Sequence, residues 1–214
     1  MYLSRLQLNS HSRQLWRTVI DQPYKLHQIV MSGFPDGITR EKANVLHRLE
    51  IEADNAILLV QSDLKPDWGK IHPDLLLHAS PFDPIPNPAI REMNGVQLTP
   101  DRLLHFRLTA NPTKRLSSGK GNKPGPRRAL YDEADQHAWL QEKGKLNGFR
   151  LLDVQISQPA KQTARKQDLT LFTVQYNGRL QITDAEKFQT AVREGIGPAK
   201  AFGCGLLSLA PARS

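Results

Sequence analysis

Residues 169–209 read LTLFTVQYNGRLQITDAEKFQTAVREGIGPAKAFGCGLLSL. The segment 169–183 is rich in β-branched and aromatic residues and predicts a strand, in which Asn177-Gly178 favours a tight reversal or a bulge. An aspartate then begins a helix over 185–194, and the glycine after it ends that helix. A short strand is expected over 206–209. These are the last three elements of a βαββαβ unit.

The residues before this segment supply the rest of the unit. Apolar and polar residues alternate over 103–110 and 149–157, as they do in strands. The acidic start of 132–145 predicts a helix between them. The six elements together follow the ferredoxin-like order.

The N-terminal half begins in the same way. Its patterns predict a strand over 2–8, helices over 13–20 (capped by Ser10 or Ser12) and 23–32, and hairpin strands over 45–52 and 56–61. The four prolines within 81–88 exclude a helix or a central strand and mark the change of domain. We therefore expect an α+β fold of tandem ferredoxin-like (RRM-like) βαββαβ domains, over 1–90 and 91–214. No aromatic RNP pattern supports base stacking on a sheet face.

Composition narrows the class of protein. The 214 residues are 39% hydrophobic and 23% charged, which is enough to build packed cores. The longest apolar run, Ala56–Val60, is far shorter than the roughly 20 residues of a membrane helix. The single cysteine, Cys204, can form neither an intrachain disulfide nor a cysteine-based zinc site. These features suit a soluble protein in a reducing cytoplasm.

Charge is concentrated in one half of the chain. The net charge is +8, but residues 1–100 hold 10 Lys and Arg against 11 Asp and Glu, whereas residues 101–214 hold 19 against 10. A basic half of this kind indicates a polyanionic partner, most often nucleic acid. The alternative is a basic protein that is merely soluble.

Several catalytic signatures are missing. The seven histidines contain no pair at i, i+3 or i, i+4, so the sequence has no helical zinc motif and no metal is expected. There is no Walker A sequence and no G-x-S-x-G elbow, and Gly195-Ile196-Gly197 lacks the third glycine of a dinucleotide fingerprint. Metallohydrolases, nucleotide-driven enzymes and serine hydrolases are therefore disfavoured.

A glycine-rich segment lies between the last helix and the last strand. It contains Gly195, Gly197, Gly203 and Gly205 around Lys200. Glycines let backbone N–H groups approach an anion, and the lysine supplies positive charge for a phosphate. The alternative is a helix C-cap followed by a bulged turn.

Tyr24 and His27 form a second candidate site. On a helix over 23–32 they are i, i+3 neighbours that point away from the face formed by Leu26, Ile29 and Val30. The histidine can act as a general acid or base, and the tyrosine can orient a nucleophile or donate to a phosphoryl oxygen. The alternative is a surface histidine without a role.

A third candidate is the segment Pro112–Arg128, which has no acidic residue. We expect it to be a mobile loop that binds phosphates, or else a solvated surface loop. Its cations are Lys114, Arg115, Lys120, Lys123, Arg127 and Arg128.

Together these residues resemble the CasE family of CRISPR RNA-processing endoribonucleases of type I-E systems. The run GIGPAKAFGCGLLSLAP at the C-terminus is similar to the glycine-rich loop of the wider family. Further similarity lies in MYLS at the start, YKLHQ at 24–28, LTANPTK at 108–114 and EADQHAWLQ at 133–141.

The resemblance implies tandem ferredoxin-like domains and a metal-independent endoribonuclease without cofactors. It would cut the CRISPR repeat transcript (pre-crRNA) 3′ of a stem-loop, stay bound to the crRNA hairpin, and join other Cascade subunits. His27 and Tyr24 match the family's catalytic histidine and tyrosine. The chemistry expected is attack by the RNA 2′-hydroxyl, which leaves 5′-hydroxyl and 2′,3′-cyclic phosphate ends. The alternative is a non-catalytic subunit that binds hairpin RNA.

Overall fold

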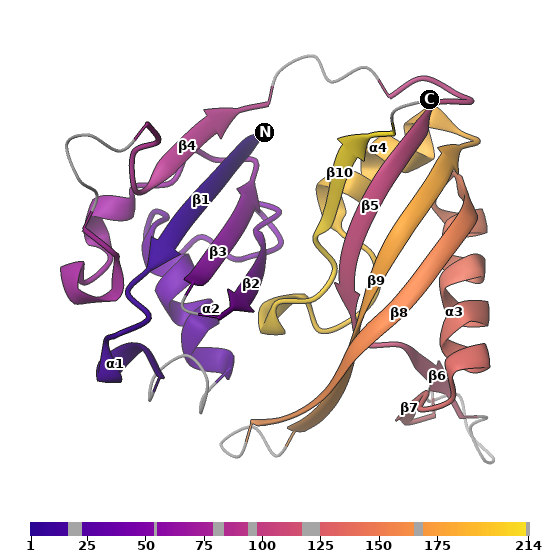
Figure 1. Ribbon diagram of the computed structural model, residues 1–214, viewed down its shortest axis with the longest axis horizontal. Helices are drawn as coiled ribbons and strands as arrows, with labels where there is room; N and C mark the ends of the chain where they lie inside the picture. The colour runs from indigo at the N-terminus through magenta and orange to yellow at the C-terminus, as the bar shows by residue number, and fades with distance from the viewer. Residues whose placement is uncertain are drawn as a thin grey trace.

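The computed structural model describes residues 1–16, 23–53, 55–78, 84–93, 98–116, 125–164 and 169–212. These residues form two units side by side, each built on a four-stranded antiparallel sheet (Figure 1). None of the helices in the described ranges is long and apolar enough to cross a membrane.

The N-terminal unit has the sheet order β2-β3-β1-β4. Its strands are β1 (Tyr2–Leu8), β2 (Leu46–Glu52), β3 (Asn55–Ser62) and β4 (Ala89–Glu92), and its helices are α1 (Arg13–Leu15) and α2 (Pro23–Ser32). The α2 helix covers one face of the sheet through Leu26 and Val30, which belong to the buried core. Ser12 caps α1, as one of the two predicted caps, and the remainder of the predicted helix over 13–20 lies largely outside the described residues.

The second helix of a ferredoxin-like unit is replaced here by two 3-10 turns. They are η2 (Trp68–Lys70) and η3 (Pro73–Leu75), and they bury Trp68 and Leu75 in the core. Pro66, Gly69 and Pro73 interrupt this stretch, and prolines and glycines disfavour a continuous α-helix.

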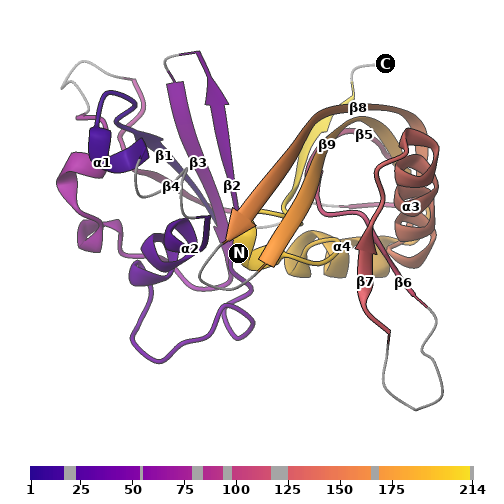
Figure 2. The same cartoon turned by 90° about the horizontal axis from the view of Figure 1, so that it is seen from below.

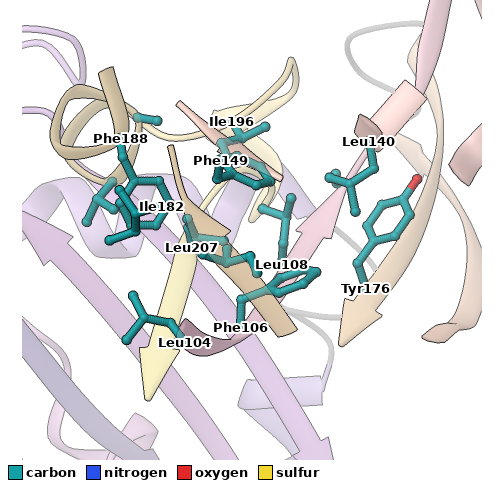
Figure 3. Close-up of a cluster of buried hydrophobic side chains, with 14 of the residues drawn as sticks. Leu104, Phe106, Leu108, Leu140, Phe149, Tyr176, Ile182, Phe188, Ile196 and Leu207 are labelled. Atoms are coloured by element: carbon teal, nitrogen blue, oxygen red, sulfur yellow. The ribbon is translucent and has the colours of Figure 1, made fainter. Parts of the chain in front are cut away.

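The C-terminal unit has the order β10-β5-β9-β8, which is the complete ferredoxin-like arrangement. Its elements are β5 (Leu103–Ala110), α3 (Glu133–Leu146), β8 (Phe149–Ala164), β9 (Leu169–Ile182), α4 (Ala185–Glu194) and β10 (Leu207–Pro211). Asp132 and Asp184 cap the two helices through their side-chain oxygens. Figure 3 shows part of the core, where Leu108 of β5 lies beside its strand partner Leu207. The predicted tandem ferredoxin-like fold is confirmed.

The Asn177-Gly178 pair does not reverse the chain. Strand β9 continues through it, and the irregularity lies on β8, where the register shifts between Leu151 and Asp153. A Cβ atom on Gly178 would overlap the carbonyl oxygen of Asp153. The glycine is therefore needed for the close approach of the bulged strand.

A short hairpin extends from the C-terminal unit. It consists of β6 (Thr113–Arg115) and β7 (Arg127–Ala129), which pair antiparallel. The prediction of a loop throughout Pro112–Arg128 was wrong at both of its ends, where backbone pairing orders the chain. Residues 117–124 lie outside the described ranges.

A buried arginine joins the two units. Arg48 of β2 is 3% exposed and donates hydrogen bonds to the carbonyl oxygen of Leu206 (3.1 Å) and to Oγ of Ser208 (2.9 Å). It also forms an ion pair with Glu50 (2.7 Å), which bonds Arg107 of β5 at 3.2 Å. These contacts fix β2 against the C-terminal sheet. Because β4 pairs with β1, the N-terminal sheet extends past the boundary predicted at residue 90.

Candidate active site

The α2 helix presents Tyr24 and His27 at the junction of the two units. Leu26 and Val30 are buried on its inner face, whereas Tyr24 is 36% exposed. His27 is half-buried, because it lies between the outer face of α2 and strand β2. The Tyr24 and His27 ring centroids are 5.5 Å apart, so both side chains can reach one substrate group.

The glycine-rich segment crosses from the C-terminal unit to α2 and β2, as Figure 1 shows for the chain before β10. Its centre is a 3-10 turn, η5 (Lys200–Phe202). The ring of Phe202 lies 6.0 Å from that of Tyr24. The structure thus brings the two candidate sites of the sequence, the Tyr24–His27 pair and the glycine-rich segment, together.

The four glycines of this segment have positive φ angles between 81° and 93°. Gly195 donates to the carbonyl of Ala191 (2.8 Å) and caps α4, and Gly205 donates to the carbonyl of Thr109 (2.8 Å). Both N–H groups are therefore used to shape the loop and are not free to bind a phosphate directly. The C-cap alternative is correct for Gly195, and phosphate binding by Gly197, Gly203 and Lys200 remains a prediction.

The site carries a concentration of positive charge. Arg40, in the turn after α2, forms an ion pair with Glu41 (2.9 Å). Partial burial, followed by repulsion from Arg40, lowers the pKa of Lys200. A lysine and an arginine that repel each other in this way favour a bound anion.

The pKa of His27 lies below that of an ordinary histidine, so its ring is more often neutral. Burial is the largest cause that lowers its pKa, Arg40 lowers it further, and Glu41 offsets part of the effect. Its Nδ1 is buried and has no hydrogen-bond partner among the described residues. We therefore take Nε2 as the ring nitrogen that a substrate would meet.

Sequence reasoning missed His47. This residue of β2 is 1% exposed, and its ring is stacked with that of His27 at 6.1 Å and an interplanar angle of 24°. Burial, followed by the proximity of His27 and Arg40, lowers the pKa of His47 to about 3. The sequence does contain a signal for this residue. His47 is polar but lies between the apolar Val45 and Leu49 at alternate positions of a strand, which face the same side.

The basic hairpin lies elsewhere. Strands β6 and β7 lie next to α3, on the side of the C-terminal unit away from α2 (Figures 1 and 2). The exposed cations pair directly across it, Lys114 with Arg128 and Arg115 with Arg127. Like charges in directly opposed positions destabilise a hairpin, so this arrangement favours a polyanion. Lys120 and Lys123 fall outside the described residues.

Over the described ranges, no three His, Cys, Asp or Glu side chains cluster closely enough to hold a metal ion. Cys204 is a free, buried thiol whose pKa burial raises to about 12. It is a packed core residue rather than a nucleophile.

The fold and this junction define a protein of tandem ferredoxin-like domains whose candidate site is shared by both. The chain matches the CRISPR associated protein family model over residues 1–211 and belongs to that family. It is 34% identical to CRISPR-associated endoribonuclease Cse3 of Thermus thermophilus, over 99% of this chain and 100% of that protein.

A further relative and a solved structure extend this comparison. The chain is 46% identical to CRISPR system Cascade subunit CasE of Escherichia coli, over 50% of this chain and 58% of that protein. The structure of Thermus thermophilus Cse3 bound to an RNA representing a pre-cleavage complex superimposes with a TM-score of 0.82. It is 33% identical in sequence and covers 98% of each chain.

Proposed function

We propose that this protein is an endoribonuclease that cleaves CRISPR repeat transcripts 3′ of the repeat stem-loop and retains the hairpin product as a cytoplasmic Cascade subunit. The observation that carries the proposal is the meeting of Tyr24 and His27 with the Lys200–Phe202 turn. The names of its relatives, an endoribonuclease and a Cascade subunit, support the same activity and assembly.

The 2′-hydroxyl of the RNA is the nucleophile in this mechanism. It attacks the adjacent phosphorus, the bond to the 5′ oxygen breaks as that oxygen takes up a proton from water, and the products are a 2′,3′-cyclic phosphate and a 5′-hydroxyl. His27 fits the role of general base, because its lowered pKa leaves the ring neutral near pH 7 and able to accept the hydroxyl proton at Nε2. No step requires a metal ion.

Tyr24 and Lys200 complete the site around the scissile phosphate. The tyrosine hydroxyl, on an exposed ring next to His27, orients the ribose or donates to a phosphoryl oxygen. Lys200, half-buried and repelled by Arg40, neutralises charge that develops on the phosphoryl oxygens. The backbone of Gly197 and Gly203 lets the phosphate approach this lysine closely.

The hairpin stem binds through phosphates rather than through base edges. A-form RNA has a deep, narrow major groove, so proteins recognise it largely by shape and phosphate contacts. The opposed cations of β6 and β7 supply such contacts away from the site of cleavage, and the sequence between these strands adds the cations Lys120 and Lys123.

Cleavage of the repeat RNA in excess EDTA tests this proposal. The protein is incubated with the repeat encoded beside its own gene, and the retained RNA is recovered after gel filtration. We expect one cut 3′ of the stem-loop and co-elution of the hairpin with the protein. Tight binding of intact, uncut RNA would instead support a non-catalytic hairpin-binding subunit, and activity restored only by Mg²⁺ would contradict the metal-independent mechanism.

A further inference from the structure

His47 occupies a position where the fold calls for an apolar side chain. Along β2, Val45 belongs to the N-terminal core and Leu49 packs against it. His47 lies between them on the same face of the strand. The neighbours Leu46 and Arg48 face the opposite way, toward Gly195 and Leu206 of the C-terminal unit.

Core packing does not explain a histidine at this place. The side chain is 1% exposed, and neither ring nitrogen has a hydrogen-bond partner among the described residues. A buried polar group without a partner lowers the stability of the folded protein, whereas a leucine or phenylalanine at the same place does not. A residue that costs stability and packs no better than its apolar alternatives is expected to serve the site next to it.

That site is His27. The centroids of the two imidazole rings lie 6.1 Å apart with their planes inclined by only 24°, and Nδ1 of His27 is itself buried without a partner among the described residues. On the other side of His47 lies Gly203, where a Cβ atom would be 3.9 Å from Nε2 of His47. The glycine-rich loop thus covers His47. His47 therefore lies against His27 and the loop and is not placed to touch RNA.

We propose that His47 is a positioning residue for His27, which presents a neutral hydrogen-bond acceptor to Nδ1–H and so directs Nε2 toward the 2′-hydroxyl. The inference rests on the proposed ribonuclease function. Hydrogen bonds of catalytic groups are often long in substrate-free proteins and tighten when substrate binds. A histidine oriented by a second group in this way keeps the tautomer that a general base needs.

The charges around the two rings are compatible with this role. Arg40 and Glu41 act on them from the turn after α2, Tyr24 lies beside His27 on α2, and Arg40 also repels Lys200 of η5. Since the pKa of His47 is about 3, its ring stays neutral wherever cleavage can be measured. It therefore accepts a hydrogen bond from the protonated form of His27 without repelling it.

The decisive variants are His47→Phe, which keeps an aromatic ring but removes both nitrogens, and His47→Gln, which keeps a hydrogen-bonding group. We expect His47→Phe to unfold at the same or a higher temperature and to bind RNA within about twofold of the parent, while its single-turnover rate falls at least about tenfold. His47→Gln should retain more of the rate. In a His27→Ala background, His47→Phe should cause no further loss, because it acts through His27.

A measurement on the parent protein tests the same inference even if the His47 variants fold poorly. In the parent bound to a non-cleavable 2′-deoxy repeat RNA, ¹⁵N NMR of labelled histidines should show His27 as the Nδ1–H tautomer. His47→Phe cleaving within about twofold of the parent, or His27 found as the Nε2–H tautomer, would overturn the inference. If the parent itself does not cleave, the ribonuclease function fails, and the tautomer measurement still decides the role of His47.

Discussion

The rings of Tyr24 and Phe202 lie 6.0 Å apart, although one belongs to the second helix of the N-terminal unit and the other to the loop before the last strand. The candidate site therefore exists only where the two units meet. The hydrogen bonds from Arg48 to Leu206 and Ser208 fix the two units against each other at this junction. The geometry of the candidate site depends on the interface as much as on either domain.

Replacing His27 by alanine should abolish cleavage and preserve binding. We expect the cleavage rate to fall at least about 100-fold, the lower end for loss of a general acid or base, with an unchanged dissociation constant for a 2′-deoxy repeat. His78→Ala, which removes an exposed histidine, is the matched control. A His27→Ala protein that cleaves at close to the parent rate would remove His27 from the mechanism.

The charges on Arg40 and Glu41 should move the pH profile of cleavage in opposite directions. A general base works when deprotonated, so the rate should rise with pH to a plateau, and burial and Arg40 place its midpoint below 6.5. Arg40→Gln should raise the midpoint, and Glu41→Gln should lower it. Single-turnover rates across the pH range test this, and midpoints that shift together, or not at all, contradict the assignment of the base.

Neutralising the β6–β7 hairpin should weaken RNA binding in a salt-dependent way. Changing Lys114, Arg115, Arg127 and Arg128 to glutamine should lower the slope of log K against log salt by about 0.7–0.9 for each phosphate that the protein no longer neutralises. Lys70→Gln, on η2 of the other unit, is the control. Slopes identical to that of the parent would show that the hairpin is only a solvated surface.

Acid should destabilise the folded protein through His47. Its pKa is about 3 in the folded state against 6.5 for an ordinary histidine, so only the unfolded state takes up the proton as the pH falls below 6.5. Above pH 6.5 His47 therefore does not lower the free energy of unfolding. By about pH 5, proton uptake by the unfolded state has lowered that free energy by about 2 kcal/mol.

Urea unfolding of the parent and of His47→Leu, each at about pH 7.5 and about pH 5, isolates this effect from that of the carboxylates. The leucine variant should lose less stability between the two values. Equal losses in the two proteins would mean that His47 is protonated in the folded state.

The fold was predictable from the sequence where local signals and packing agree. Asp184 and Gly195 delimit α4, and Pro23 begins α2, because caps and first-turn positions depend on a few neighbouring residues. The bulge opposite Gly178 was predictable only in part, because the extra residue lies on β8 rather than on the strand that carries the glycine.

The site was less predictable because it is built from long-range contacts. The helix pattern identified His27 as lying off the apolar face, but it could not show that β2 and the glycine-rich loop cover that face. Periodicity likewise assigns His47 to a buried position and says nothing of the residue it meets. The pairing of Lys114 with Arg128 depends on a hairpin whose strands are too short for a sequence pattern to reveal.

The most direct test of the central claim replaces the nucleotide 5′ to the cut by its 2′-deoxy analogue. This change deletes the proposed nucleophile and keeps the phosphates and the shape of the stem. We predict that the deoxy RNA binds almost unchanged and is not cut, whereas mass spectrometry of the products from intact RNA shows a 5′-hydroxyl and a 2′,3′-cyclic phosphate. Cleavage of the deoxy RNA, or products with a 3′-hydroxyl and a 5′-phosphate, would contradict attack by the RNA itself at Tyr24 and His27.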